Sequence, residues 1–180
     1  MIRNPVRSVV FLASLMLLQV VVLNNVDIDG YIIPYVYVVG VAALAFVFGR
    51  ATAMLCGFAA GVVMDMFLHT GGLHAMACVA VVYLCAPLAR VFFRLSDKEL
   101  DGFDPFDAKN SRTAGLTLLY VLLVIHGFVL YFCETIRLSA VLPALWHALI
   151  GAAVSFVVSV VALSFVGVKK NRRTVRNRGL

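Results

Sequence analysis

Charged side chains are scarce in this 180-residue chain, because Asp, Glu, Lys and Arg together make up only 13% of it. That is about half of the share in an ordinary soluble domain, too little to cover a water-soluble particle, and it also argues against a disordered chain or a coiled coil. Four cysteines are too few for a disulfide scaffold, and none has the spacing of a zinc site. Hydrophobic residues reach 63% of the chain, so we expect most of it to lie in lipid.

The hydrophobic residues form long continuous runs. A hydrocarbon core about 30 Å thick needs about 20 apolar residues in a helix, and only helices or closed barrels satisfy their backbone groups there. We therefore predict an all-α, polytopic integral membrane protein. Its six predicted transmembrane helices are residues 8–23, 33–48, 51–68, 73–93, 114–133 and 140–168. We expect one transmembrane domain over residues 1–168 and a basic tail over residues 169–180.

Positive charge is distributed unevenly over the two sides of this predicted membrane topology. With six spans, all lysines and arginines except Arg137 fall on one side. Because Lys and Arg concentrate in cytoplasmic loops, both termini are predicted to be cytoplasmic. The basic tail is typical of an orientation signal that also contacts anionic lipid, and it lacks the aromatic residues that would stack on bases, so we predict no nucleic-acid partner.

Ionisable residues inside the spans are few. A charge in the membrane costs free energy, so such a residue is kept mainly where it has a role. They gather toward the membrane face opposite the tail: Asp65, His69, His74, His126, Glu134 and His147. Structural or partner contact is the favoured interpretation, while a metal ion or the passage of a proton or solute are alternatives. The sequence contains no HExxH, GxSxG or P-loop motif, so we predict no catalytic residue, metal or cofactor.

Small residues recur every four positions in the third predicted span, at Ala53, Gly57 and Gly61, and the series ends at Asp65. This spacing places them on one face of a helix, where small side chains let another backbone approach closely. We call these four residues the small-residue stripe. It predicts close helix packing, either inside the bundle or against a partner, and in the second case Gly61→Leu should weaken assembly with that partner.

The same region resembles the G-x-x-x-D-x-[LF] … G-x-x-A pattern of the rod shape-determining protein MreD family, through Gly61, Asp65, Gly72 and the residues around them. The pair Leu18-Gln19 is similar to the outer end of that family's first helix, and residues 126–134 to an aromatic, carboxylate-ending fifth helix. The loop over residues 94–112 departs from the family. We single out these residues for helix packing or partner contact: Gln19, Ala53, Gly57, Gly61, Asp65, Gly72, His74, His126 and Glu134.

The resemblance implies a non-enzymatic scaffold in the bacterial inner membrane that belongs to the cell-elongation (rod) complex and maintains cell shape. Its implied partners are MreC, cytoskeletal MreB, a SEDS-family glycosyltransferase for peptidoglycan synthesis and a class B penicillin-binding protein, together with membrane lipids. The family is also similar in helix arrangement to the substrate-binding subunits of energy-coupling-factor transporters. A small-solute-binding transporter subunit is therefore the alternative.

The departing loop contains Phe103 and Phe106 on either side of Pro105. These rings could form a hook for a cytoplasmic partner, although aromatic side chains resting on lipid headgroups are the favoured interpretation.

Overall fold

The computed structural model describes residues 4–25, 33–96, 103, 105, 110–137, 139 and 141–176. The described residues form helices and connecting segments, as the prediction of an all-α chain requires. The helices are α1 (Pro5–Val21), a 3-10 turn η1 (Leu23–Asn25), α2 (Tyr37–Leu44), α3 (Arg50–Leu68), α4 (Leu73–Phe93), α5 (Arg112–Thr135) and α6 (Val141–Arg176).

Four of these helices are long and apolar enough to cross a membrane: α3, α4, α5 and the part of α6 from Val141 to Ser164. The prediction of a helical membrane protein is therefore confirmed. Helix α1 is apolar but shorter, at 17 residues. Helix α6 continues past residue 168, where the apolar run ends, and its 36 residues measure about 54 Å at 1.5 Å per residue.

The second predicted span differs most from expectation. Only eight of its residues, Tyr37–Leu44, are helical, and they cover about 12 Å. All eight are buried, because α1, α3, α4 and α5 pack around this helix. Residues 33–36 before it are not helical. A segment surrounded by protein need not be a full-length helix, since neighbouring side chains can satisfy its backbone groups in place of helical hydrogen bonds.

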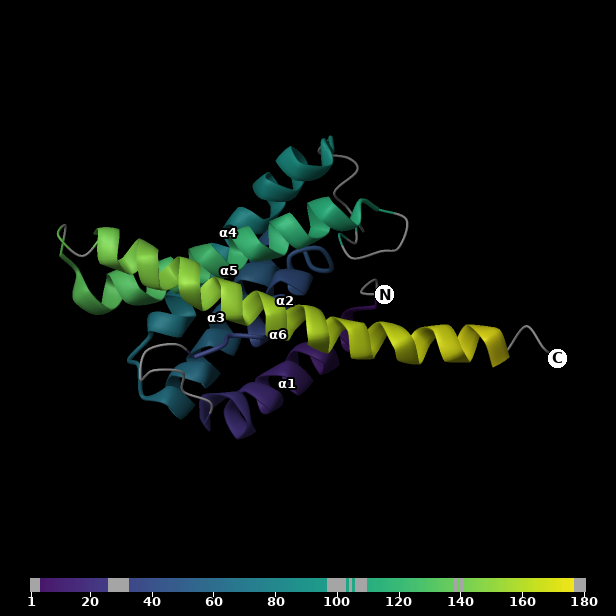
Figure 1. The fold of residues 1–180 in the computed structure, drawn as a ribbon, viewed down its shortest axis with the longest axis horizontal. Helices are drawn as coiled ribbons and strands as arrows, with labels where there is room; N and C mark the ends of the chain where they lie inside the picture. Colours follow the sequence, from purple (N-terminus) through teal and green to yellow (C-terminus); the bar gives the residue numbers. More distant parts are fainter. Residues whose placement is uncertain are drawn as a thin grey trace.

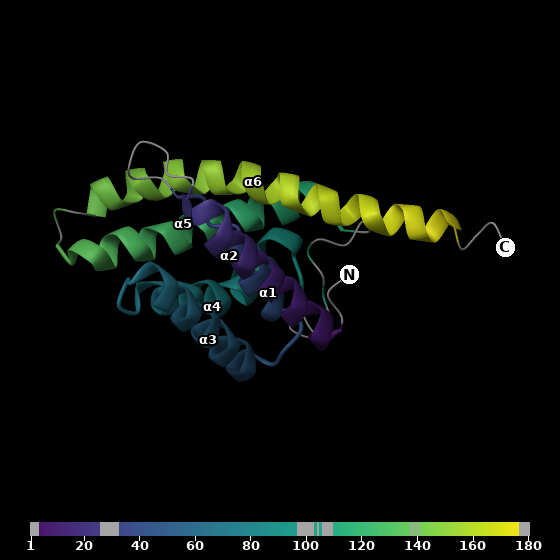
Figure 2. The same cartoon turned by 90° about the horizontal axis from the view of Figure 1, so that it is seen from below.

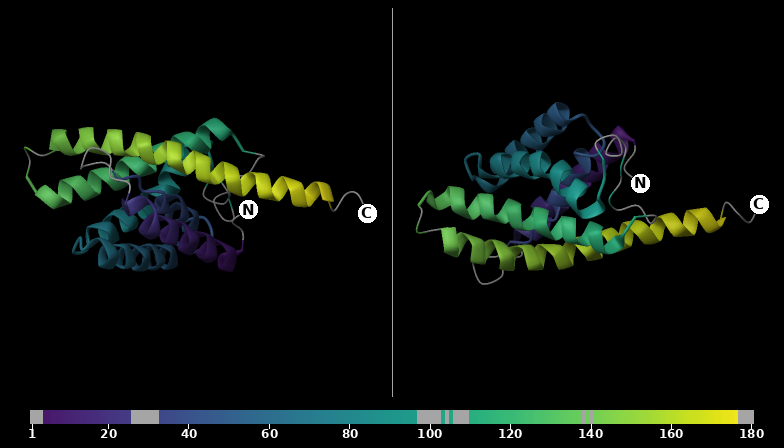
Figure 3. Two further views of the ribbon diagram at one scale, coloured as in Figure 1. Left: turned by 60° about the horizontal axis from the view of Figure 1, so that its bottom comes forward. Right: turned by 90° about the horizontal axis from the view of Figure 1, so that it is seen from above.

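The long helices pack in chain order, α3 against α4, α4 against α5 and α5 against α6 (Figures 1 and 2). Helices α1, α3 and α5 begin, and α4 and α6 end, toward the same end of the molecule, and α6 projects beyond the bundle there (Figure 3). Five described and exposed arginines lie at this end, and we therefore call it the cationic end: Arg7, Arg50, Arg90, Arg94 and Arg112. Arg137 follows the end of α5 and lies at the opposite end.

Phe103 lies against the bundle. Its ring makes edge contacts with Phe93 and Phe46, with ring centroids 4.9 and 6.1 Å apart. Phe103 is thus half-buried, because apolar rings from two parts of the chain cover part of it. Part of the Phe103 ring stays exposed, so the partner hook and the headgroup contact both remain predictions, and Phe106 lies outside the described residues.

Candidate functional site

The turn between α3 and α4 brings three of the predicted site residues together. Helix α3 is followed by His69 in the left-handed conformation. Gly72, the residue just before α4, has a φ of 103°, a conformation that favours glycine. Gly72 has no side chain to cap α4, and Asp65 takes that role from the preceding helix. Its Oδ1 accepts hydrogen bonds from the His74 amide at 2.9 Å and the Thr70 hydroxyl at 2.5 Å, and its Oδ2 accepts one from the Ala75 amide at 2.9 Å.

This arrangement explains a carboxylate inside a span. The amide groups in the first turn of a helix have no partner within the helix, and the helix dipole favours negative charge there. Asp65 is buried, at 8% exposure, and it satisfies two of these amides. Its side chain is therefore engaged in holding α4 to α3.

The small-residue stripe faces α4. A Cβ atom added to Gly61 would lie 2.4 Å from the Ala75 Cα and 2.6 Å from the His74 carbonyl oxygen, so the two backbones are in contact. At Gly57 the nearest atom would be a methyl group of Val82, at 2.9 Å. Ala53 is also buried. Of the two expected roles, packing inside the bundle is the one that the structure displays, and a partner helix could reach the stripe only by displacing α4.

Two buried histidines share one tyrosine hydroxyl. The Tyr37 oxygen lies 2.8 Å from His74 Nδ1 and 2.7 Å from His126 Nε2. The single phenolic hydrogen can be donated to only one ring, so the other ring must donate to the phenolic oxygen. His126 Nδ1 is buried without a partner. Because buried N–H groups without acceptors are rarer than bare acceptors, we assign the donated hydrogen to His74 and the Nε2 hydrogen to His126.

Tyr35 completes this group of rings. Its centroid lies 5.4 Å from that of His74 and 5.2 Å from that of His126, and the two histidine rings are 5.8 Å apart. We call Tyr35, Tyr37, His74 and His126 the ring cluster. It ties α2 and the segment before it to α4 and α5, and its rings fill the space between them by direct contact.

Gln19, near the end of α1, supports the non-helical backbone before α2. Its amide nitrogen donates to the Pro34 carbonyl at 2.8 Å and to the Asn24 side chain at 3.1 Å, and its amide oxygen accepts from the Val36 amide at 3.0 Å. Gln19 is completely buried. One side chain thus satisfies backbone groups that have no helical partner.

Ser155 of α6 performs the same task from the other side. Its hydroxyl accepts from the Tyr35 amide at 2.9 Å and donates to the Gly151 carbonyl at 2.7 Å. Ser159, one turn later, is equally buried, but its hydroxyl has no hydrogen-bond partner. The two serines therefore differ in use although the sequence presents them alike.

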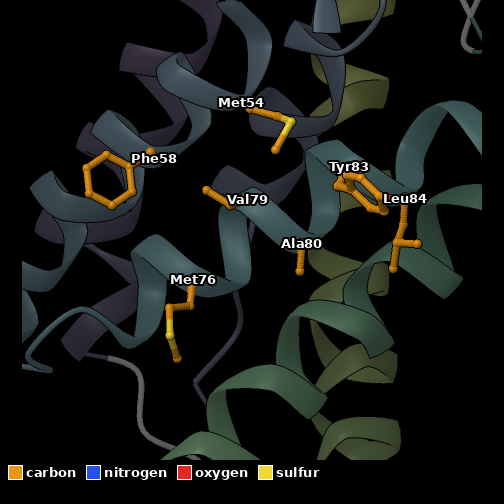
Figure 4. Close-up of a pocket in the computed structure, with 7 residues that line it drawn as sticks. All are labelled: Met54, Phe58, Met76, Val79, Ala80, Tyr83 and Leu84. Carbon is orange, nitrogen blue, oxygen red and sulfur yellow. The ribbon is translucent and has the colours of Figure 1, made fainter. Parts of the chain in front are cut away.

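An open hollow on the exposed side of α3 and α4 is the second candidate site. It has a volume of about 560 Å³. Figure 4 shows its lining: Met54, Phe58, Met76, Val79, Ala80, Tyr83 and Leu84. The guanidinium carbon of Arg50 lies 4.5 Å from the centroid of the Tyr83 ring. We call this hollow the α3–α4 groove.

The structure does not bring every predicted residue into these contacts. Glu134 is exposed in the last turn of α5. In the described ranges no group of three or more His, Cys, Asp or Glu residues could hold a metal ion, and all four cysteines are free. The sequence analysis did not single out Tyr35 and Tyr37. Two tyrosines within three residues after Pro34, in an otherwise apolar run, could have indicated a buried polar contact.

The chain matches no known protein-family model, no curated protein and no solved structure.

Proposed function

We propose that this chain is an MreD-like, non-enzymatic scaffold of the cell-elongation complex in the bacterial inner membrane. It would maintain rod shape by linking MreC and MreB to a SEDS-family glycosyltransferase and a class B penicillin-binding protein. The proposal includes six membrane crossings with both termini in the cytoplasm. It starts from the resemblance around Asp65, Gly72 and His74.

One observation carries the proposal beyond the resemblance: the polar residues of the motif are used to build the fold. Asp65 caps α4, His74 and His126 share Tyr37, and Gln19 supports the segment before α2. These contacts give each side chain a structural role, which supports a chain that acts without catalysis. The surface of the bundle is then what remains to act, as in a scaffold.

The distribution of cations supports the proposed topology. The described arginines of the cationic end lie at the beginnings of α1, α3 and α5 and at the end of α4. Lysine and arginine are retained on the cytoplasmic side during insertion, so this end would face the cytoplasm. Helix α6 projects from it, where a cytoplasmic filament such as MreB could contact the chain.

Partner helices would dock on faces other than the small-residue stripe, because α4 already covers that stripe. Helix α1 exposes the small residues Ala13 and Ser14 beside Leu17, which is 67% exposed, and α6 exposes Ala153 two turns after Trp146, which is 64% exposed. Small exposed residues let another backbone approach closely. These two faces are the proposed contacts for the transmembrane helices of MreC and the synthases.

The transporter alternative requires a cavity for a solute beside Asp65, His74 and Glu134. Asp65 and His74 are occupied by hydrogen bonds within the chain, and the rings around His74 contact one another directly. Glu134 lies exposed at the end of α5. This arrangement favours the scaffold.

The proposal is tested by purifying the tagged full-length chain from its own cells in mild detergent and identifying the proteins that accompany it. We expect MreC and the synthase pair, and we expect depletion of the chain to turn rods into spheres. Photo-crosslinking residues at Leu17 and Trp146 should then capture one of these partners. Co-purification of an ATPase pair, with unchanged cell shape, would overturn the scaffold in favour of the transporter.

A further inference from the structure

The α3–α4 groove is almost entirely apolar, and its own side chains fill it only partly. Phe58, Met76 and Tyr83 remain 51%, 48% and 48% exposed along it. Met76 and Leu84 are eight residues apart on α4, which corresponds to about 12 Å along the helix. The groove is therefore an open apolar hollow that runs along α4.

A positive charge lies next to this groove. Arg50 is the first residue of α3, at the cationic end, and its guanidinium group lies over the Tyr83 ring that lines the groove. The structure shows no carboxylate of the described residues paired with Arg50. Gly49, which precedes it, provides no side-chain cap for the first amides of α3, so the positive end of the helix dipole adds to the charge. An acyl chain would match the apolar groove, and the anionic headgroup joined to it would match the cation at the end of the groove.

The lining residues favour a lipid over a partner helix. Transmembrane helices associate through small residues that let their backbones approach, and the small-residue stripe of α3 faces α4 inside the bundle, away from the groove. The groove is instead lined mainly by long or aromatic side chains such as Met54, Phe58 and Met76. Methionine side chains adapt to irregular apolar shapes, which suits a flexible acyl chain.

We propose that the α3–α4 groove binds an anionic phospholipid of the leaflet at the cationic end, with one acyl chain in the groove and the phosphate at Arg50. The site is independent of the scaffold proposal, because it concerns only this chain and the bilayer.

Native mass spectrometry of the full-length protein tests the site, with phosphatidylglycerol and phosphatidylcholine of identical acyl chains added in equal amounts. A single interfacial cation should favour the anionic lipid about fivefold. Arg50→Gln should abolish most of this preference. Arg112→Gln, which removes another exposed cation of the same end, is the matched control and should retain it. Equal loss in the two variants, or none in Arg50→Gln, would overturn the proposal.

The acyl-chain contact is tested separately. Ala80→Leu should fill the groove and reduce retained phosphatidylglycerol several-fold, and size-exclusion chromatography checks that the variant is folded. Phosphatidylglycerol with eight-carbon chains gives the same test without a substitution, and it should be retained less than the long-chain lipid. Equal retention of both chain lengths contradicts the acyl-chain contact. A photo-crosslinker at Phe58 that captures a protein in cells, and no lipid, would assign the groove to a partner helix and overturn the lipid site.

Discussion

Replacing Gly61 by alanine should destabilise the bundle, although the same change stabilises most helices. The new methyl carbon would lie 2.4 Å from the Ala75 Cα and 2.6 Å from the Ala75 amide nitrogen. Carbon atoms in contact prefer a separation of about 3.5–4.0 Å, so α3 and the first turn of α4 must separate by about 1 Å. Such overpacking costs about 3 kcal/mol, and the better helix propensity of alanine returns about 1 kcal/mol.

The expected net loss is therefore about 2 kcal/mol, which corresponds to a fall in Tm of roughly 4–8 °C for a chain of this size. Gly57→Ala is the matched control, one turn earlier on the same face of α3. Its nearest neighbour would be the Val82 Cγ2 atom at 2.9 Å, and the next nearest the Cys78 carbonyl oxygen at 3.6 Å. Val82 is stiff at χ1 within α4, but one methyl group gives way more easily than a backbone, so Gly57→Ala should lose clearly less stability than Gly61→Ala.

The cysteines of the chain provide the assay. Cys78 and Cys85 are fully buried free thiols inside α4, so a dye that fluoresces on reaction with thiols reports their exposure as the protein unfolds. Cys56→Ser and Cys133→Ser remove the two partly exposed thiols from the background. If Gly61→Ala melts at or above the parent temperature, or Gly57→Ala falls as far, the backbone contact between α3 and α4 is refuted.

Three further predictions use the same melting assay. Asp65→Ala should lower the free energy of unfolding by about 2 kcal/mol, because two α4 amides lose their acceptor. Asp65→Asn keeps one carbonyl oxygen and should lower it by about half as much. Equal losses in the two variants would contradict the capping role. Ser155→Ala should cost about 1–2 kcal/mol because it strands the Tyr35 amide, whereas Ser159→Ala should be neutral or stabilising because its hydroxyl has no partner. Gln19→Leu should lower the free energy of unfolding by about 2–3 kcal/mol and accelerate hydrogen exchange at the Val36 amide, which loses its acceptor. Unchanged exchange at that amide would show that Gln19 does not support the segment before α2.

The long helices could be located from sequence because water excludes their side chains and breaking residues separate them. Helix α4 was predicted over residues 73–93 and is observed as Leu73–Phe93, and α3 begins one residue before its predicted start at 51. The shortness of α2 could not be predicted. Hydropathy measures how apolar a segment is, and a valine-rich segment has the same value whether lipid or other helices surround it.

The site shows a similar division. Asp65, Gly72 and His74 could be grouped in advance because a short turn joins their helices. The pairing of Tyr37 with His126 links residues 89 positions apart, and it depends on how α2 lies between α4 and α5. The small-residue stripe predicted a close approach of two backbones, but its spacing did not specify whether the second backbone belongs to this chain. Packing partners are a property of the whole bundle, and a local pattern does not contain them.

Three of the buried polar side chains in this bundle lie where regular helical hydrogen bonding is interrupted. Gln19 and Ser155 satisfy the non-helical backbone before α2, and Asp65 satisfies the amides at the start of α4. An unsatisfied backbone group in hydrocarbon costs several kcal/mol, so each interruption requires a polar side chain from another helix. The Tyr37 hydroxyl differs, since its partners are the His74 and His126 rings and the Cys78 thiol, and none of them is a backbone group. A polar residue within a membrane span is therefore weak evidence for chemistry until the backbone near it has been shown to be satisfied without it.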